Sequence, residues 1–156
     1  MIFRQLFDSV SSTYSYVLAS RRGGEALIID PVLEKVDRYL KLMEELDLKL
    51  VKAVDTHLHA DHITGLGALR DRTRCITVMG EQSKVDVVSM RIADGDKLGV
   101  EGLSLDVLYT PGHTDDSYSF ISATACSPAT RCSSAAPAAP ISRMAIPAPN
   151  MRACSA

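Results

Sequence analysis

A seven-residue stretch near the middle of the chain concentrates side chains that bind metal ions. It holds three of the four histidines of the chain, His57, His59 and His62, together with the carboxylate of Asp61. Neutral imidazole and carboxylate are the usual protein ligands of zinc and of non-haem iron. A polar loop that carries histidines by chance would not gather them in one place. The stretch therefore predicts a metal site.

The fourth histidine lies in a second motif about fifty residues later. His113 follows Pro111 and Gly112, which force a tight turn. This turn can aim His113 at the site that His57 begins. By itself His113 would be an ordinary turn residue, but beside the first motif it is a candidate metal ligand.

Each histidine motif follows a segment that is typical of a strand. Residues 50–54 form an apolar run before the first motif, and residues 103–108 precede the second. Residues 63–69, after the first motif, indicate a turn into a helix. The pattern is that of a strand delivering a ligand-rich loop to its C-terminal end, where α/β sheets place their sites.

The rest of the ordered sequence predicts an α+β fold. Leu33, Val36, Leu40, Met43 and Leu46 recur at steps of three and four residues, which indicates an amphipathic helix. Further strands are expected at residues 2–7, 14–19, 25–30, 75–79, 97–100 and 117–122. This order suits half of a sheet-on-sheet sandwich that is covered by helices.

Length and composition exclude several classes of protein. A chain of 156 residues provides at most one domain with a substantial core. The net charge is −2 and no basic run exists, so nucleic acid is not an expected partner. No segment has a signal-peptide layout or membrane-spanning length, which predicts a cytoplasmic protein without a membrane partner. The four cysteines form no C-x-x-C pair, so they indicate neither a zinc knuckle nor a disulfide framework.

The histidine motifs resemble those of a known superfamily. The sequence T-H-L-H-A-D-H at residues 56–62, followed by T-P-G-H-T at residues 110–114, resembles the metallo-β-lactamase superfamily. Residues 61–65, 78–84 and 111–117 are more closely similar to the persulfide dioxygenases, also called sulfur dioxygenases, of that superfamily. The two histidine motifs indicate only the superfamily, whereas the flanking segments point to the dioxygenase branch.

The resemblance covers residues 1–122 and implies a partial metallo-β-lactamase-like domain. This would be the N-terminal half of an αββα sandwich. Residues 123–156 differ completely, since they consist mainly of Ala, Pro, Ser and Thr without periodicity. Such composition is typical of a disordered low-complexity tail. The family continues at this point into a strand that ends in F-T-G-D, whose Asp is a metal ligand, and that Asp is absent here.

A shift of reading frame accounts for this tail. Read one codon base out of phase, with the free third bases chosen, the codons from Ala123 onward spell F-T-G-D, with the Asp spread across the codons of Ala129 and Thr130. Loss of a single G after the codon of Ser122 would produce the shift. We therefore expect residues 123–156 to be out of frame and disordered. We also expect the second sheet to be missing, which would expose one face of the first.

The resemblance implies a mononuclear iron centre. One Fe(II) per chain would be held by His57, His113 and the absent Asp, the arrangement of non-haem oxygenases, with zinc as the alternative metal. His59, Asp61 and His62 would then surround these ligands or be vestigial. The substrates would be glutathione persulfide and O2, the products sulfite and glutathione, and the assembly considered is a homodimer. The chain as written would be inactive, because it lacks the third ligand.

Two other interpretations stay open. In a glyoxalase II-like hydrolase, His57, His59 and His113 would hold one metal ion, and Asp61 and His62 a second. The pair would generate hydroxide that attacks a glutathione thioester. Alternatively, the chain is a non-catalytic fragment or pseudogene product. Metal stoichiometry and sulfite production separate the first two interpretations.

Overall fold

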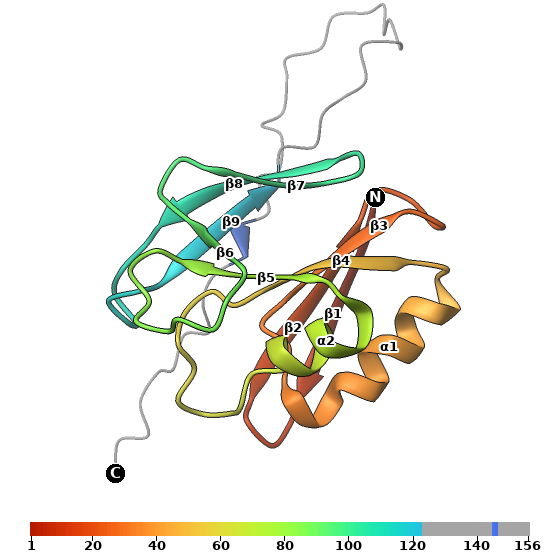
Figure 1. The fold of residues 1–156 in the computed structure, drawn as a ribbon, viewed down its shortest axis with the longest axis horizontal. Coiled ribbons are helices and arrows are strands. Elements are labelled where there is room, and N and C mark those ends of the chain that lie inside the picture. The colour runs from red at the N-terminus through yellow and green to blue at the C-terminus, as the bar shows by residue number, and fades with distance from the viewer. Residues whose placement is uncertain (123–144, 147–156) are drawn as a thin grey trace, which may run out of the picture.

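The computed structural model describes residues 1–122 and 145–146, which form two β-sheets and two α-helices (Figure 1). The elements in chain order are β1 (Ile2–Asp8), β2 (Thr13–Ala19), β3 (Glu25–Ile29), the 3-10 turn η1 (Leu33–Lys35), α1 (Val36–Glu45), β4 (Lys49–Val54), α2 (Leu66–Thr73), β5 (Ile76–Gly80), β6 (Met90–Ile92), β7 (Lys97–Val100), β8 (Leu103–Tyr109), β9 (Tyr118–Ser122) and β10 (Ala145–Ile146). Neither helix has the length and apolar character needed to traverse a bilayer. The fold is α+β, as expected.

The first sheet contains six strands in the order β1-β2-β3-β4-β5-β6. Strands β1 to β3 pair antiparallel, and β3 to β6 pair parallel. The carboxyl ends of the parallel strands meet at one edge of the sheet. The loops after β3 and β4, which contain Asp30 and the first histidine motif, are therefore neighbours in space.

The second sheet pairs β7, β8 and β9 antiparallel, with β10 beside β9. The expectation that this sheet would be missing is therefore wrong. Residues 97–122 precede the altered tail and suffice for three strands, which lie over the first sheet in Figure 1. The predicted disorder of residues 123–156 lies outside the described residues, except at β10.

Alternating side chains bury the first sheet on both faces. Leu27 and Ile29 of β3 point into the layer between the two sheets, where they meet Leu105 and Phe120. Ile28, between them in sequence, points to the opposite face, which α1 and α2 cover. This alternation follows from the period of two in a strand, and apolar residues on both sides are typical of a parallel strand covered on both faces. The sheet that carries the first histidine motif is thus anchored from both sides.

The expected elements are present, with two differences. The predicted helix begins as the turn η1 before it becomes α1. Strand β6 was not expected. It has three residues, of which only Ile92 is buried, so neither apolar alternation nor length marks it in the sequence.

Candidate metal centre

The four histidines of the chain converge at the edge where the loops after β4 and β8 meet. The ring centroids of His57 and His59 are 4.1 Å apart, and those of His59 and His62 are 4.3 Å apart. His113, from the loop after β8, places its ring 5.0 Å from that of His57. Strands β4 and β8 belong to different sheets, so the cluster lies where the sandwich brings the two sheets together. The structure thus joins all the histidines that the sequence singled out.

Three-residue groups with closely spaced ligand atoms also occur here. Within the described part of the chain, His59, Asp61 and His62 offer ligand atoms that lie within 4.8 Å of one another, as do Asp30, Asp55 and His59. His57 and His113 form a pair without a third such partner among these residues. The carboxylate that the resemblance would add to this pair is the one that the chain lacks.

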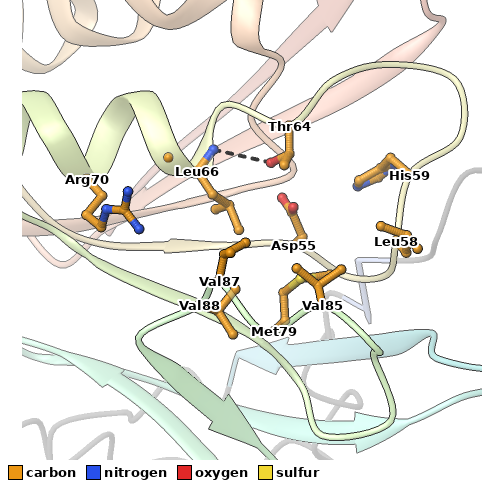
Figure 2. A pocket seen from close by; sticks show the side chains of 11 residues that line it. Asp55, Leu58, His59, Thr64, Leu66, Arg70, Met79, Val85, Val87 and Val88 are labelled. Carbon is orange, nitrogen blue, oxygen red and sulfur yellow. Dashed lines mark hydrogen bonds between the residues drawn. The ribbon is translucent and has the colours of Figure 1, made fainter.

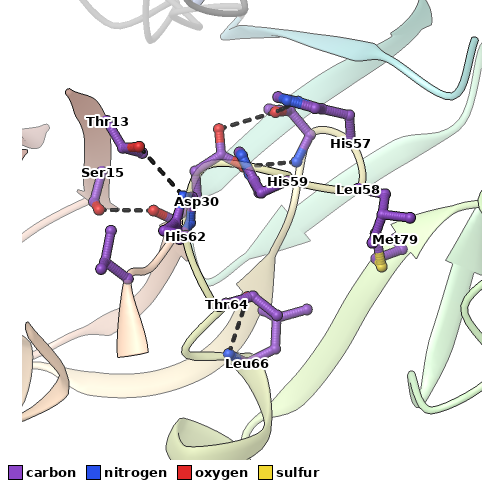
Figure 3. A network of polar contacts seen from close by, with 12 residues as sticks. Thr13, Ser15, Asp30, His57, Leu58, His59, His62, Thr64, Leu66 and Met79 are labelled. Carbon is purple, nitrogen blue, oxygen red and sulfur yellow. Dashed lines mark hydrogen bonds and ion pairs between the residues drawn. The ribbon is translucent and has the colours of Figure 1, made fainter. Parts of the chain in front are cut away.

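Asp30 holds the first histidine motif from below and was not foreseen as a site residue. Its backbone adopts a φ of 50°, an uncommon left-handed conformation that turns the chain directly after β3. The Thr56 backbone N–H donates to its Oδ1 at 2.7 Å, and the Thr56 hydroxyl donates to its Oδ2 at 2.9 Å. The Nε2 of His59 lies 3.1 Å from Oδ1 (Figure 3). One buried carboxylate therefore fixes both the start of the loop and the ring of His59.

The hairpin between β1 and β2 holds the far end of the same loop. The hydroxyl of Thr13 donates to Asp61 Oδ2 at 2.7 Å and lies 3.3 Å from His62 Nδ1. Partial burial opposes ionisation of Asp61, but the hydrogen bonds from Thr13 and His62 outweigh it and lower the pKa of Asp61 to about 2. Asp61 is therefore a carboxylate at neutral pH, the form that binds metal.

Contacts from the second sheet complete the frame. The Leu58 N–H donates to Asp116 Oδ2 at 3.0 Å, and the Tyr118 N–H donates to the Thr56 carbonyl at 2.9 Å. Asp116 was expected only as part of a family motif, and its position in the loop of His113 is the signal that could have identified it. Tyr118 and Ser117, whose side chains could have lined a pocket, are instead buried by strand packing.

The environment gives neighbouring histidines opposite protonation tendencies. Burial and the nearby charge of His59 lower the pKa of His57 to about 4, so this ring is neutral at neutral pH. Burial also opposes protonation of His59, but its hydrogen bond to Asp30 and the surrounding carboxylates raise its pKa above the usual value. A neutral imidazole is the form that binds metal, whereas a protonated one must first lose its proton. His57 is thus ready to serve as a ligand.

An orphaned buried atom supports a metal at this edge. The side chain of His62 is 3% exposed, and its Nε2 has no hydrogen-bond partner among the described residues. Buried polar atoms without partners are rare in native structures and call for an explanation. Together with the neutral ring of His57 and the adjacent ring of His113, this orphan shows that the residues present fit a metal ion.

Comparison with known proteins connects this arrangement to one superfamily. The family model described as Metallo-beta-lactamase superfamily matches residues 8–85. The chain is 41% identical over 122 residues to Persulfide dioxygenase ETHE1, mitochondrial, of Homo sapiens, which covers 78% of this chain and 48% of that protein. It is 29% identical over 119 residues to the Hydroxyacylglutathione hydrolase of Rhodopseudomonas palustris (strain BisB5), which covers 75% of this chain and 46% of that protein.

Solved structures give the same picture. The crystal structure of ETHE1 from Myxococcus xanthus superposes with a TM-score of 0.75 at 50% identity, over 78% of this chain and 54% of that one. A metallo-beta-lactamase from Staphylococcus aureus subsp. aureus COL gives a TM-score of 0.72 at 29% identity, over 79% of this chain and 38% of that one. The chain spans about half the length of the curated relatives that it matches.

Proposed function

The chain belongs to the metallo-β-lactamase superfamily, and we propose that it carries the N-terminal metal ligands of a persulfide dioxygenase. The reaction converts glutathione persulfide, O2 and water into glutathione, sulfite and two protons. One observation carries the proposal. Over nearly the same residues, the chain is 41% identical to a persulfide dioxygenase and 29% identical to a hydroxyacylglutathione hydrolase.

In this proposal one Fe(II) is held by His57 and His113, with the Asp of the missing F-T-G-D segment as the third ligand. Iron with two histidines and one carboxylate keeps open positions for O2 and for the substrate sulfur, and supplies the redox chemistry when bound. The chain's own residues supply the geometry. The Asp30 carboxylate holds the loop through Thr56, and Asp116 ties the loop after β8 to Leu58.

The hydrolase is the second candidate, and one observation favours it. His59, Asp61 and His62 form a group with closely spaced ligand atoms, and in that interpretation Asp61 and His62 bind a second metal ion. The dioxygenase proposal instead assigns these side chains to the surroundings of a single metal. The orphaned Nε2 of His62 is compatible with either arrangement.

We extend the proposal to the tail, where the gene has lost one G after the codon of Ser122. Sequencing the genomic DNA across codons 115 to 130 tests this directly. A restored G would give the family's F-T-G-D segment, whereas an unchanged sequence would mean that the chain is made as written. The cytoplasm and a homodimer remain our expectations for location and assembly, to be tested by fractionation and by light scattering.

The activity is tested with two proteins, the chain as written and the product of a repaired gene with the G restored. With glutathione persulfide, we expect the repaired protein to consume O2 and produce sulfite in equal amounts, and the chain as written to do neither. S-D-lactoylglutathione serves as the thioester substrate for the alternative. Hydrolysis of the thioester by the repaired protein, without O2 consumption, would overturn the dioxygenase proposal.

A further inference from the structure

A pocket of about 170 Å³ lies behind the imidazole cluster, between α2, the end of β5 and the loop after it (Figure 2). Its walls are mainly apolar and include Met79, Val85 and Val88. His59 also lines it, so the pocket and the histidine cluster share one side chain. The proposed reaction assigns no role to this pocket.

A single carboxylate interrupts the apolar wall. Asp55 is 2% exposed, and its Oδ1 has no hydrogen-bond partner among the described residues. In Figure 2 the carboxylate stands within the ring of lining side chains, beside Leu66 and Thr64. An unpartnered buried polar atom costs about 1–3 kcal/mol. A group that enters the pocket and hydrogen-bonds to Asp55 would recover this cost.

We propose that the pocket is a binding site for a small, mainly apolar molecule that carries one hydroxyl group, held at Asp55. A hydroxyl fits because it can donate to a carboxylate and can also accept from a carboxylic acid. A charged group would instead lose its hydration against apolar walls with one partner to replace it. The volume suits one aromatic ring, since an engineered apolar cavity of about 150 Å³ binds benzene.

The mouth of the pocket makes entry possible. Leu58 and Val87 line it and are 53% and 75% exposed, so they form an apolar rim that reaches the solvent. Arg70, also exposed, stands at the end of the pocket that α2 forms. A phenol can therefore pass over an apolar rim and direct its hydroxyl inward to Asp55.

Gly67 offers a way to close the pocket without harming the fold. It lines the pocket from α2, and a Cβ built on it meets no heavy atom within 4 Å. A leucine at this position has room and would occupy part of the pocket. Replacing a glycine within a helix also favours the helix. Loss of ligand binding in Gly67→Leu would therefore not reflect unfolding, and Gly67→Ala is the matched control.

The test uses the full chain, with phenol and benzene as probes in an NMR titration that follows the ring protons of His59. We expect phenol to bind at least about fivefold more tightly than benzene, the worth of about one net hydrogen bond. Asp55→Leu should remove this preference, Gly67→Leu should abolish binding of both probes, and Gly67→Ala should retain it. Equal binding of phenol and benzene by the unaltered chain, binding of neither, or phenol binding that survives in Gly67→Leu would overturn the proposal.

Discussion

The ring of Tyr118 lies directly against Gly80, so that a Cβ on Gly80 would fall 2.0 Å from Tyr118 Cε2. Gly80 ends β5 in the first sheet, and Tyr118 begins β9 in the second. The Tyr118 hydroxyl donates to the side chain of Gln82, just beyond Gly80. The close approach of the two sheets beside the histidine cluster therefore requires a residue without a side chain at position 80.

Gly80→Ala should destabilise the chain through this contact. The added methyl group must displace a fully buried ring, and overpacking of this kind costs about 1–3 kcal/mol. Urea unfolding, followed by circular dichroism, measures the change. Gly67→Ala is the control, because a Cβ at Gly67 meets open space and the substitution should raise stability by up to about 1 kcal/mol. Equal midpoints for the two variants would contradict the packing argument.

The metal loop could be predicted from the sequence because its candidate ligands are local. His57, His59, Asp61 and His62 fall within seven residues, so no tertiary information is needed to group them. The contribution of Asp30 could not be found in this way. It depends on the parallel pairing of β3 with β4, which places Asp30 beside a loop that begins 25 residues later. Asp-Pro at positions 30 and 31 indicated only the end of a strand.

The second sheet shows where inference from family resemblance went too far. The lost F-T-G-D segment suggested that half of the sandwich would be absent. Strands β7 to β9, however, place Leu98, Leu105 and Phe120 against the first sheet without any contribution from that segment. Burial of these side chains follows from the alternating pattern of residues 103–109, which the sequence displays. The local pattern was thus the better guide to this layer.

Asp30→Ala should weaken metal binding more than its effect on stability alone would suggest. The substitution removes the acceptor of two hydrogen bonds from Thr56 and the partner of His59. Loss of a residue that orients metal ligands typically lowers metal affinity by about 10–100-fold. Competition with a chromogenic chelator, using zinc and cobalt, measures the affinity.

Asp86→Asn is the matched control for this variant, because the Asp86 side chain is 97% exposed. Its metal affinity should stay within about twofold of the unaltered chain. Asp30→Ala at unaltered metal affinity, in a protein shown to be folded, would rule out the orienting role of Asp30.

Asp55 should make stability depend on pH. Burial, followed by the negative charge of Asp30, raises the pKa of Asp55 from 3.8 to about 8. Between these values the native state keeps a proton that the unfolded state has released, so the contribution of Asp55 to stability is lost as pH rises from about 4 to 8. Asp55→Asn lacks this proton equilibrium. Its free energy of unfolding, minus that of the unaltered chain, should therefore increase across this range.

Urea titrations at half-unit pH intervals measure the difference between these two proteins. Asp106→Asn is the control, since that residue pairs with Lys97 at the surface and has a partner in the structure. Its difference from the unaltered chain should stay flat between pH 5 and 8. A difference that falls with pH for Asp55→Asn would reverse the sign required by a raised pKa.

Single histidine substitutions should separate the mononuclear from the dinuclear centre. In the product of the repaired gene, His57→Ala and His113→Ala should each abolish metal binding, because each removes one of three proposed ligands. His62→Ala should leave one metal ion per chain, because His62 lies outside that set. In a dinuclear centre His57→Ala would spare the second ion, and His62→Ala would reduce two ions to one. Metal content by mass spectrometry, with protein quantified by amino-acid analysis, distinguishes these results. A drop from two ions to one in His62→Ala would favour the hydrolase, whose second metal needs both Asp61 and the Nε2 of His62 that is left without a partner here.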